Sequence, residues 1–261
     1  MMALLRWIGW LALALLGLQL FFVARIALMA VVAPESTAFQ RSEAWRVLQE
    51  RGALRWRQQW LDYERISEHL KHAVVASEDD DFAHHDGVDW EAMEQAWRKN
   101  AKAEEDAARR NARNVPASAS KPAPMSAAKP APAPAAKAAK VVGGSTITQQ
   151  LAKNLLLSGE RTLLRKAQEF VLTLALEALL DKRRILEIYL NSVEWGEGVF
   201  GAEAATQHYY KKSATKLSAY EAARLAVMLP RPKYFEKLPN SGYLASRAQT
   251  ISARMPSARL P

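Results

Sequence analysis

The stretch GGSTITQQLAKN, residues 143–154, predicts the start of a helix with a polar face. Thr146 and Gln149 have the spacing of a capping box, in which each side chain satisfies a backbone amide of the other residue. One turn apart on a shared face lie the polar residues Gln150, Lys153 and Asn154. The glycines allow close backbone approach at a helix N-terminus, where unpaired amides attract anions. The spacing is not that of a Walker P-loop, and an ordinary solvated helix face explains Lys153 equally well.

Helical patterns extend on both sides of this stretch. Apolar residues at helical spacing begin after Ser67 and Asp89, and they recur over Leu163–Leu180, Arg184–Leu190 and Ala202–Tyr210. A second capping box, Ser218 with Glu221, opens the last clear helix, which Pro230 ends. Because no region shows sustained strand alternation, the fold class is predicted to be mainly α.

The segment Glu78–Asp89 carries six carboxylates in twelve residues. Like charges at this density raise one another's pKa values and favour cation binding, so a metal loop is one interpretation. The spacing of an EF-hand is absent, because there is no glycine at the sixth position and no glutamate at the twelfth. A solvated acidic loop between helices explains the same residues, and both interpretations stay open at this point.

A further set of charged residues precedes an apolar helix. Arg161 and Arg165 share one face of this predicted helix, and Glu169 follows one turn later. As an exposed pair, arginine and glutamate would stabilise the helix by only about 0.2–0.5 kcal/mol. The turns after Glu169 are apolar nearly all round, which places the carboxylate where the helix enters the interior. A carboxylate there beside two arginines is typical of a functional site.

Residues 1–33 are predicted to be a short cytoplasmic tip and a single transmembrane anchor. Trp7–Ala24 is an 18-residue run without a charged residue, and a second apolar stretch follows Arg25. Together they are long enough to span a bilayer. A cleaved secretory signal is the alternative, but the apolar stretch exceeds the usual signal core of about 7–15 residues. The basic residue before the span and the acidic one after it place residues 34–261 on the periplasmic side.

Within the domain formed by residues 34–261, residues 101–140 are predicted to be a disordered insert. They contain 16 Ala and 6 Pro but no Leu, Ile, Phe, Tyr or Trp, so they cannot form an apolar core. Their Lys-Pro-Ala-Pro sequences are typical of a polyproline-II linker.

The chain has 261 residues, no cysteine and a net charge of +9. The lack of cysteine excludes a thiol nucleophile, a cysteine-bound metal and a disulfide. The charge suggests an anionic partner, but its distribution argues against nucleic acid. Residues 101–140 carry 8 basic and 3 acidic side chains, residues 34–100 carry 9 and 14, and residues 141–261 carry 17 and 10. In the part predicted to fold, residues 34–100 therefore carry a net negative charge and residues 141–261 a net positive charge.

Taken in order, these segments resemble the glycosyltransferase family of peptidoglycan synthases, glycosyltransferase family 51. The match consists of Glu-Asp-x-x-Phe-x-x-His-x-Gly at Glu78–Gly87, the whole of Gly143–Asn154, Arg-Lys-x-x-Glu at Arg165–Glu169, and a fourth signature at Lys182–Asn191. It covers about residues 45–100 and 141–255, together with the N-terminal anchor. The resemblance implies a lysozyme-like glycosyltransferase domain. Because the chain lacks room for a transpeptidase domain, it is similar to the monofunctional members. The long insert departs from the family, which joins the first two signatures by a short mobile loop.

The resemblance implies a reaction and a set of site residues. Such a family polymerises lipid II into β-1,4-linked glycan strands at the outer face of the inner (cytoplasmic) membrane, with inversion and release of undecaprenyl pyrophosphate. It implies that Glu78 is the catalytic base and Glu169 a second catalytic carboxylate, with Lys153, Arg161 and Arg165 as the pyrophosphate cradle. Acidic neighbours suit the base, because like charge makes a carboxylate a better proton acceptor. The other substrate-binding residues implied are Asp79, Phe82, His85, Ser145, Thr146, Gln150, Asn154 and Lys166.

The resemblance implies that Glu169 helps to hold the pyrophosphate, either through the neighbouring basic side chains or through a divalent cation, Mg or Mn, and no organic cofactor is expected. The expected partners are lipid II, the nascent glycan strand, the membrane, and proteins of cell-wall synthesis or division, but not nucleic acid. A lytic muramidase of lysozyme-like fold is the nearest alternative, although hydrolysis needs no cationic cluster. An inactive membrane-anchored scaffold is the alternative from another class, and the intact Glu78 and Glu169 count against it.

Overall fold

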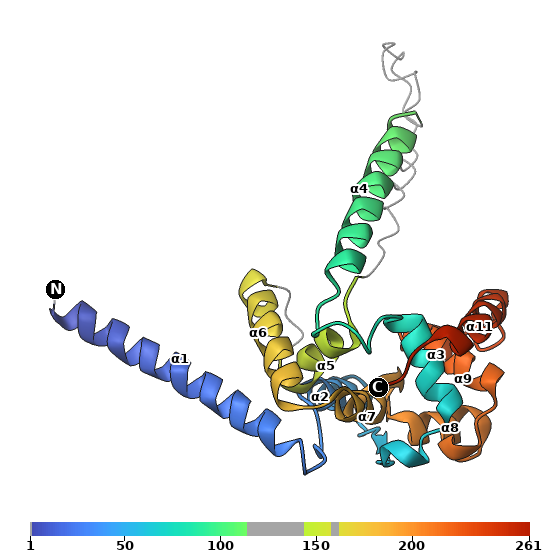
Figure 1. The fold of residues 1–261 in the computed structure, drawn as a ribbon, viewed down its shortest axis with the longest axis horizontal. Helices are drawn as coiled ribbons and strands as arrows, with labels where there is room; N and C mark the ends of the chain where they lie inside the picture. Colours follow the sequence, from blue (N-terminus) through green and yellow to red (C-terminus); the bar gives the residue numbers. More distant parts are fainter. Residues whose placement is uncertain (1, 114–143, 158–161) are drawn as a thin grey trace, which may run out of the picture. The chain divides into compact units, whose positions relative to one another are not determined.

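The computed structural model describes residues 2–113, 144–157 and 162–261, and it is mainly helical (Figure 1), as predicted. The chain divides into two compact units, one formed by Met1–Val88 with Ser145–Pro261 and the other by Asp89–Gly144. Predictions for Arg161 and for residues 114–140 lie outside the described residues.

The helices of the first unit are α1 (Met2–Leu28), α2 (Ala38–Arg51), α3 (Glu68–Glu78), α5 (Ile147–Leu156), α6 (Leu163–Leu179), α7 (Lys182–Ser192), α8 (Ala202–Tyr210), α9 (Ala219–Met228), α10 (Pro232–Glu236) and α11 (Gly242–Arg254). Short 3-10 helices cover Tyr63–Arg65, Ala214–Lys216 and Met255–Ser257. The strands are β1 (Arg57–Gln58), β2 (Glu194–Gly196) and β3 (Val199–Phe200). The second unit contains α4 (Trp90–Arg113).

Both predicted capping boxes are present at the helix starts. Thr146 accepts a hydrogen bond from the backbone of Gln149 at the start of α5, and Ser218 does the same with Glu221 at the start of α9. In each box the side chain of the third residue returns a bond to the cap. A cap of this kind stabilises a helix by about 1 kcal/mol, so local sequence fixes where α5 begins.

The core surrounds α3 and α5. Helix α3 packs against α9 and α11, and α5 packs against α2, α6 and α7. The apolar faces of α3 and α5 are almost fully buried, through residues such as Leu70, Val74, Leu151 and Leu155. Burying a leucine or valine side chain contributes about 1.5–3 kcal/mol, so these two helices are held rigidly at the centre of the unit.

A three-stranded sheet of order β1-β3-β2 lies beside the helices. Strand β1 runs parallel to β3, and β2 runs antiparallel to it. These strands are two or three residues long, which is too short to show an alternating pattern in the sequence.

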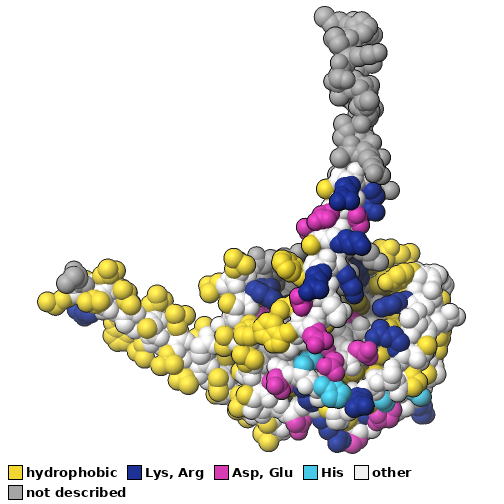
Figure 2. All heavy atoms as spheres, turned by 45° about the horizontal axis from the view of Figure 1, so that its top comes forward, with side chains coloured by type: hydrophobic (Ala, Val, Ile, Leu, Met, Phe, Trp, Pro, Cys, Tyr) yellow, Lys and Arg dark blue, Asp and Glu magenta, His cyan; other side chains and the backbone are white. Residues whose placement is uncertain are grey.

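Among the described helices, α1 is the one that is long and apolar enough to cross a membrane, with a mean hydropathy of 2.2 over its most apolar window. Figure 2 shows hydrophobic side chains along α1, and only 6% of that window is buried, so α1 is not a core helix. The helix ends at Leu28, before the predicted end of the anchor at residue 33. Its C-terminal end joins the domain, because Ile26 is fully buried and Gln19 exchanges side-chain hydrogen bonds with Gln168 of α6.

In the second unit, α4 continues through residues 101–113. The prediction of disorder is therefore wrong for these residues. They contain alanine together with Lys, Glu and Arg, which are all strong helix formers, and the six prolines of residues 101–140 come after them. A segment without core residues can still extend a helix that has already begun, because propagation is easier than nucleation.

Candidate active site

Glu78 is the last residue of α3, and a chain of side-chain hydrogen bonds orients it. Gln150 of α5 donates from Nε2 to Glu78 Oε2 at 3.0 Å. The hydroxyl of Tyr189, from α7, donates to Gln150 Oε1 at 2.9 Å. Because the hydroxyl occupies the amide oxygen, the amide nitrogen must face Glu78. Three helices thus fix one carboxylate.

The surroundings of Glu78 raise the pKa of its carboxyl above the ordinary value. Burial is the main cause, and the hydrogen bond from Gln150 opposes it. The charge of Asp79 raises the pKa of Glu78 further, while the charge of Lys153 lowers it. The sequence predicted this direction from the acidic neighbours, but desolvation is the larger effect. A carboxylate with a raised pKa is a better proton acceptor, which suits a general base.

Asp79 joins the loop that follows Glu78, called the Glu78 loop, to the start of α5. Its Oδ1 lies 2.9 Å from His85 Nε2, and its Oδ2 accepts a hydrogen bond of 2.9 Å from the backbone amide of Ile147. The backbone amide of Gly87 donates to His85 Nδ1 at 3.1 Å, so the neutral imidazole carries its proton on Nε2 and donates it to Asp79. Because Ile147 is the first residue of α5, the Asp79 carboxylate also interacts favourably with the partial positive charge at the N-terminus of that helix.

Thr146 and Gly87 make a second link between the same two segments. The hydroxyl of Thr146 donates to the carbonyl of Gly87 at 2.6 Å. Gly87 has a φ of 83°, and a Cβ there would lie 2.7 Å from Glu177 Cγ. A glycine is therefore required by both the backbone conformation and the space.

Four of the residues predicted to bind substrate use their side chains in contacts within the protein. Asp79, His85 and Thr146 are largely buried and use their polar atoms within the protein. Phe82 is fully buried, with the ammonium of Lys182 4.6 Å from its ring centroid. None of these four side chains is among the residues that line the cavity described below, and their contacts hold the chain around Glu78.

The acidic segment after Glu78 does not gather into a metal loop. Asp80 pairs with Arg254 at 3.0 Å, and Asp81 pairs with His84 at 2.8 Å, both at the surface. Over the described part of the chain, no group of three or more His, Asp or Glu side chains is arranged to hold a metal ion. Of the two interpretations left open, the solvated loop fits the structure.

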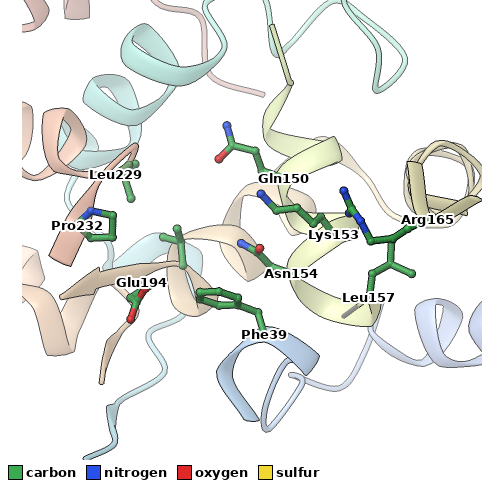
Figure 3. A pocket seen from close by; sticks show the side chains of 10 residues that line it. Phe39, Gln150, Lys153, Asn154, Leu157, Arg165, Glu194, Leu229 and Pro232 are labelled. Atoms are coloured by element: carbon green, nitrogen blue, oxygen red, sulfur yellow. The ribbon is translucent and has the colours of Figure 1, made fainter. Parts of the chain in front are cut away.

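A cavity of about 430 Å³ lies next to this arrangement. Its lining includes the predicted residues Gln150, Lys153, Asn154 and Arg165. Figure 3 shows Gln150, Lys153 and Asn154 pointing to the same side from α5, with Phe39, Glu194, Leu229 and Pro232 across the space. Gln150 therefore connects the cavity to Glu78, and two cations lie on the same wall. Ser145 is exposed just before the cap of α5 and is not among the lining residues.

Glu169 reaches the cavity through its neighbours. Its side chain is buried, with Oε2 accepting a hydrogen bond of 3.0 Å from Arg165 Nη1 and Oε1 paired with Lys166 Nζ. This pairing holds Arg165, whose guanidinium lines the cavity. Both carboxylate oxygens already face cations, so the residues around Glu169 do not fit a divalent metal ion. Glu169 is suited to orient Arg165.

Two residues of this site carried no predicted role. Tyr189 lies inside the recognised segment Lys182–Asn191, and the only signal for it was a polar hydroxyl on an otherwise apolar helix face. Glu194 follows that segment in a strand that the sequence did not predict. Burial raises the pKa of Glu194 to about 7, although the charge of Lys233, 3.5 Å away, lowers it.

Comparison with known proteins identifies the fold family. The model of the transglycosylase family matches residues 44–109 and 126–256. The chain belongs to the transglycosylase family. The gap in this match, residues 110–125, falls within the segment predicted as an insert. The mainly helical structure and the transglycosylase match confirm the predicted lysozyme-like domain.

Relatives of this transglycosylase chain are similar over almost their whole length. A biosynthetic peptidoglycan transglycosylase of Burkholderia thailandensis is 48% identical over 260 residues, which is 98% of this chain and 88% of that protein. Proteins of the same name from Paraburkholderia phytofirmans and Paraburkholderia xenovorans are 46% and 45% identical, over 98% of this chain and 94% of each relative.

Proposed function

We propose that this chain is a peptidoglycan glycosyltransferase that polymerises lipid II into β-1,4-linked glycan strands, with inversion and release of undecaprenyl pyrophosphate. One observation carries the proposal. Gln150 lines the cavity together with Lys153 and Arg165, and its amide donates a hydrogen bond to the buried carboxylate of Glu78. This arrangement offers a proton acceptor and a cationic site close together, and the names of the relatives agree with such a reaction.

The proposed step moves one proton and exchanges one bond. The 4-hydroxyl oxygen of the acceptor sugar attacks the anomeric carbon of the donor, and Glu78 accepts the hydroxyl proton. The bond between the anomeric carbon and the pyrophosphate oxygen breaks, and its electron pair leaves with the pyrophosphate. No acid is needed for this leaving group, in contrast to a glycosidase.

The leaving pyrophosphate gains negative charge in the transition state, so cations already in place beside it lower the barrier. Lys153 and Arg165 are proposed for this role, with Arg161 as a third cation and Gln150, Asn154 and Ser145 as neighbouring polar contacts. Glu169 and Lys166 would position Arg165. No step is assigned to Mg or Mn, because the carboxylate oxygens of Glu169 are already paired.

The membrane location is part of the same proposal. Helix α1 would anchor the chain in the inner membrane, with the N-terminus in the cytoplasm and the domain in the periplasm. The first turn of α6 exposes Leu163 and Leu164, at 91% and 82%, and α6 contacts α1. An exposed apolar turn beside a membrane helix is suited to the bilayer surface, where the lipid chain of the substrate lies. Proteins of cell-wall synthesis or division would be met on this membrane face.

The test uses the full chain in detergent or nanodiscs with labelled lipid II. Glu78→Gln should lower the rate of polymer formation by about 10²–10⁴-fold, the usual contribution of a general base. Asp81→Asn is the matched control, because Asp81 is an exposed carboxylate of the same loop. It should keep nearly the full rate. Circular dichroism would show that both variants are folded.

Two results would overturn the proposal. The first is polymer formation that persists in the Glu78→Gln variant, which would exclude Glu78 as the catalytic base. The second is solubilisation of finished glycan by the wild type with no polymerisation of lipid II, which would make the chain a lytic muramidase.

A further inference from the structure

A second groove lies in the same unit, away from Glu78. Two cavities of about 670 and 310 Å³ share Trp56, Arg57 and His208 in their linings. The two cavities therefore adjoin at these three side chains beside β1, and together they are called the groove. It is larger than the cavity beside Glu78, and the proposed reaction makes no use of it.

The two acidic side chains that line the groove, Glu197 and Glu236, already have partners. The carboxylate of Glu197 is taken by Arg51 at 2.9 Å and Arg46 at 3.7 Å. The carboxylate of Glu236 accepts from the backbone amide of Glu197 at 2.9 Å and lies 3.3 Å from His208 Nε2.

By contrast, Arg57 and Lys237 line the groove and take part in no ion pair with a carboxylate among the described residues. The nearest polar contact of the Arg57 guanidinium is His208 Nδ1, at 3.4 Å. The local charge therefore favours an anionic ligand.

The wall that carries Arg57 is fixed in place. Trp56 packs its half-buried ring on Phe200, with centroids 5.3 Å apart. The amide of Arg57 donates to the carbonyl of Gly198 at 2.8 Å. Gly198 has a φ of 73°, and a Cβ there would lie 2.4 Å from the carbonyl oxygen of Arg55. This close approach holds Trp56 and Arg57 at the groove and needs a glycine.

The groove and the cavity beside Glu78 share two structural elements. Strand β2 begins with Glu194 in that cavity, and Glu197 in the groove follows its end. Helix α10 begins with Pro232 in the cavity and ends with Glu236 in the groove. Five helical residues rise about 7.5 Å, so the cavity and the groove lie close together along α10.

We propose that this groove binds the elongating strand through carboxylates of the peptides attached to its sugars. The ligand class is a glycan that carries acidic peptides. Arg57 and Lys237 would bind the carboxylates, and Trp56 would offer an apolar face to a sugar or peptide side chain. The inference rests on the proposed function, because only a polymerase at the neighbouring cavity would deliver such a strand.

The experiment measures binding separately from catalysis. The full chain in nanodiscs is titrated against fluorescent, uncrosslinked glycan strands, either with intact peptides or after an amidase has removed the peptides. The wild type and the Glu78→Gln variant should bind peptide-bearing strands equally. The double variant Arg57→Ala/Lys237→Ala should bind them about tenfold more weakly, since two partly exposed charge pairs are lost.

The matched control is Lys216→Ala/Arg247→Ala, which removes two exposed cations outside the groove and should bind as the wild type does. Strands without peptides should bind the wild type about as weakly as the double variant binds intact strands. The proposal is overturned if peptide removal leaves the affinity unchanged, or if both double variants lose the same affinity. If the chain polymerises lipid II but its affinity for strands depends neither on their peptides nor on Arg57 and Lys237, only the proposal for the groove is refuted. If the chain binds strands in a peptide-dependent way but makes no polymer, only the proposed function is refuted.

Discussion

Asp79→Asn tests whether the Glu78 loop and α5 are held together by one buried carboxylate. The side chain of Asp79 is only 3% exposed, and it accepts from both His85 Nε2 and the amide of Ile147. An asparagine of the same shape has a single acceptor oxygen, so its NH2 group must face one of these two donors. One hydrogen bond to a charged acceptor is lost, and one buried donor is left without a partner.

The expected cost follows from these two changes. A hydrogen bond to a charged group contributes about 1.5–3 kcal/mol, and a buried unsatisfied donor costs about 1–3 kcal/mol. Because the two overlap in part, we expect the free energy of unfolding to fall by about 2–4 kcal/mol. For a domain of this size, such a loss lowers the melting temperature by roughly 5–15 °C.

The assay is denaturant unfolding of the full chain, combined with a double-mutant cycle of Asp79→Asn and His85→Gln. The two residues touch, so their effects should be non-additive by about 0.5–3 kcal/mol. Asp80→Asn is the control, because Asp80 makes a surface pair with Arg254 and should cost less than about 1 kcal/mol. An Asp79→Asn variant as stable as Asp80→Asn, or an additive cycle, would refute the reasoning.

Three further expectations concern titration and charge. Since the pKa of Glu78 is raised and a base must be ionised, polymerisation should decline on acidification at a higher pH than an ordinary carboxylate would give, which a pH–rate profile of kcat/KM checks. The pKa of Glu194 is raised to about 7 in the fold, so the wild type should lose stability as the pH rises from about 4.5 to 7. The Glu194→Gln variant has no carboxyl to ionise and should avoid this loss. In urea unfolding it should be more stable than the wild type by up to roughly 3 kcal/mol at pH 8 and equally stable at pH 4. Glu169→Gln removes the charge that holds Arg165, and we expect a fall in kcat of about 10²-fold in a folded protein, whereas an unchanged rate would exclude the positioning role.

Much of the architecture could be predicted because it depends on local patterns. The capping box at Thr146 and Gln149 lies within four residues of sequence, and the structure has it as predicted. The apolar run after Glu169 likewise placed that carboxylate at the entrance to the interior, where it is buried. Periodicity and capping are properties of neighbouring residues, so one sequence is enough to recognise them.

The function of individual side chains depended on contacts that the sequence does not show. Phe82 and His85 stand in a recognised signature, yet one is fully buried and the other donates to Asp79. Tyr189 orients Gln150 from a position 39 residues away in the sequence. A signature identifies which residues belong to a site, but burial and hydrogen-bond partners decide which of them face the cavity and which support it.

The position of Lys153 gives the proposed reaction an electrostatic advantage. Before the reaction, its charge favours the ionised form of Glu78, against the effects of burial and of Asp79. When Glu78 takes the proton, its negative charge disappears at the same time as the pyrophosphate gains one. Lys153 lines the cavity, so its charge can stabilise the leaving pyrophosphate once the Glu78 carboxylate is neutral, without any movement of the side chain. A cation that is already in place needs no reorganisation during the step, which is the condition under which electrostatic stabilisation lowers a barrier most. Neutralising Lys153 should therefore reduce both the ionised fraction of Glu78 and the stabilisation of the leaving group.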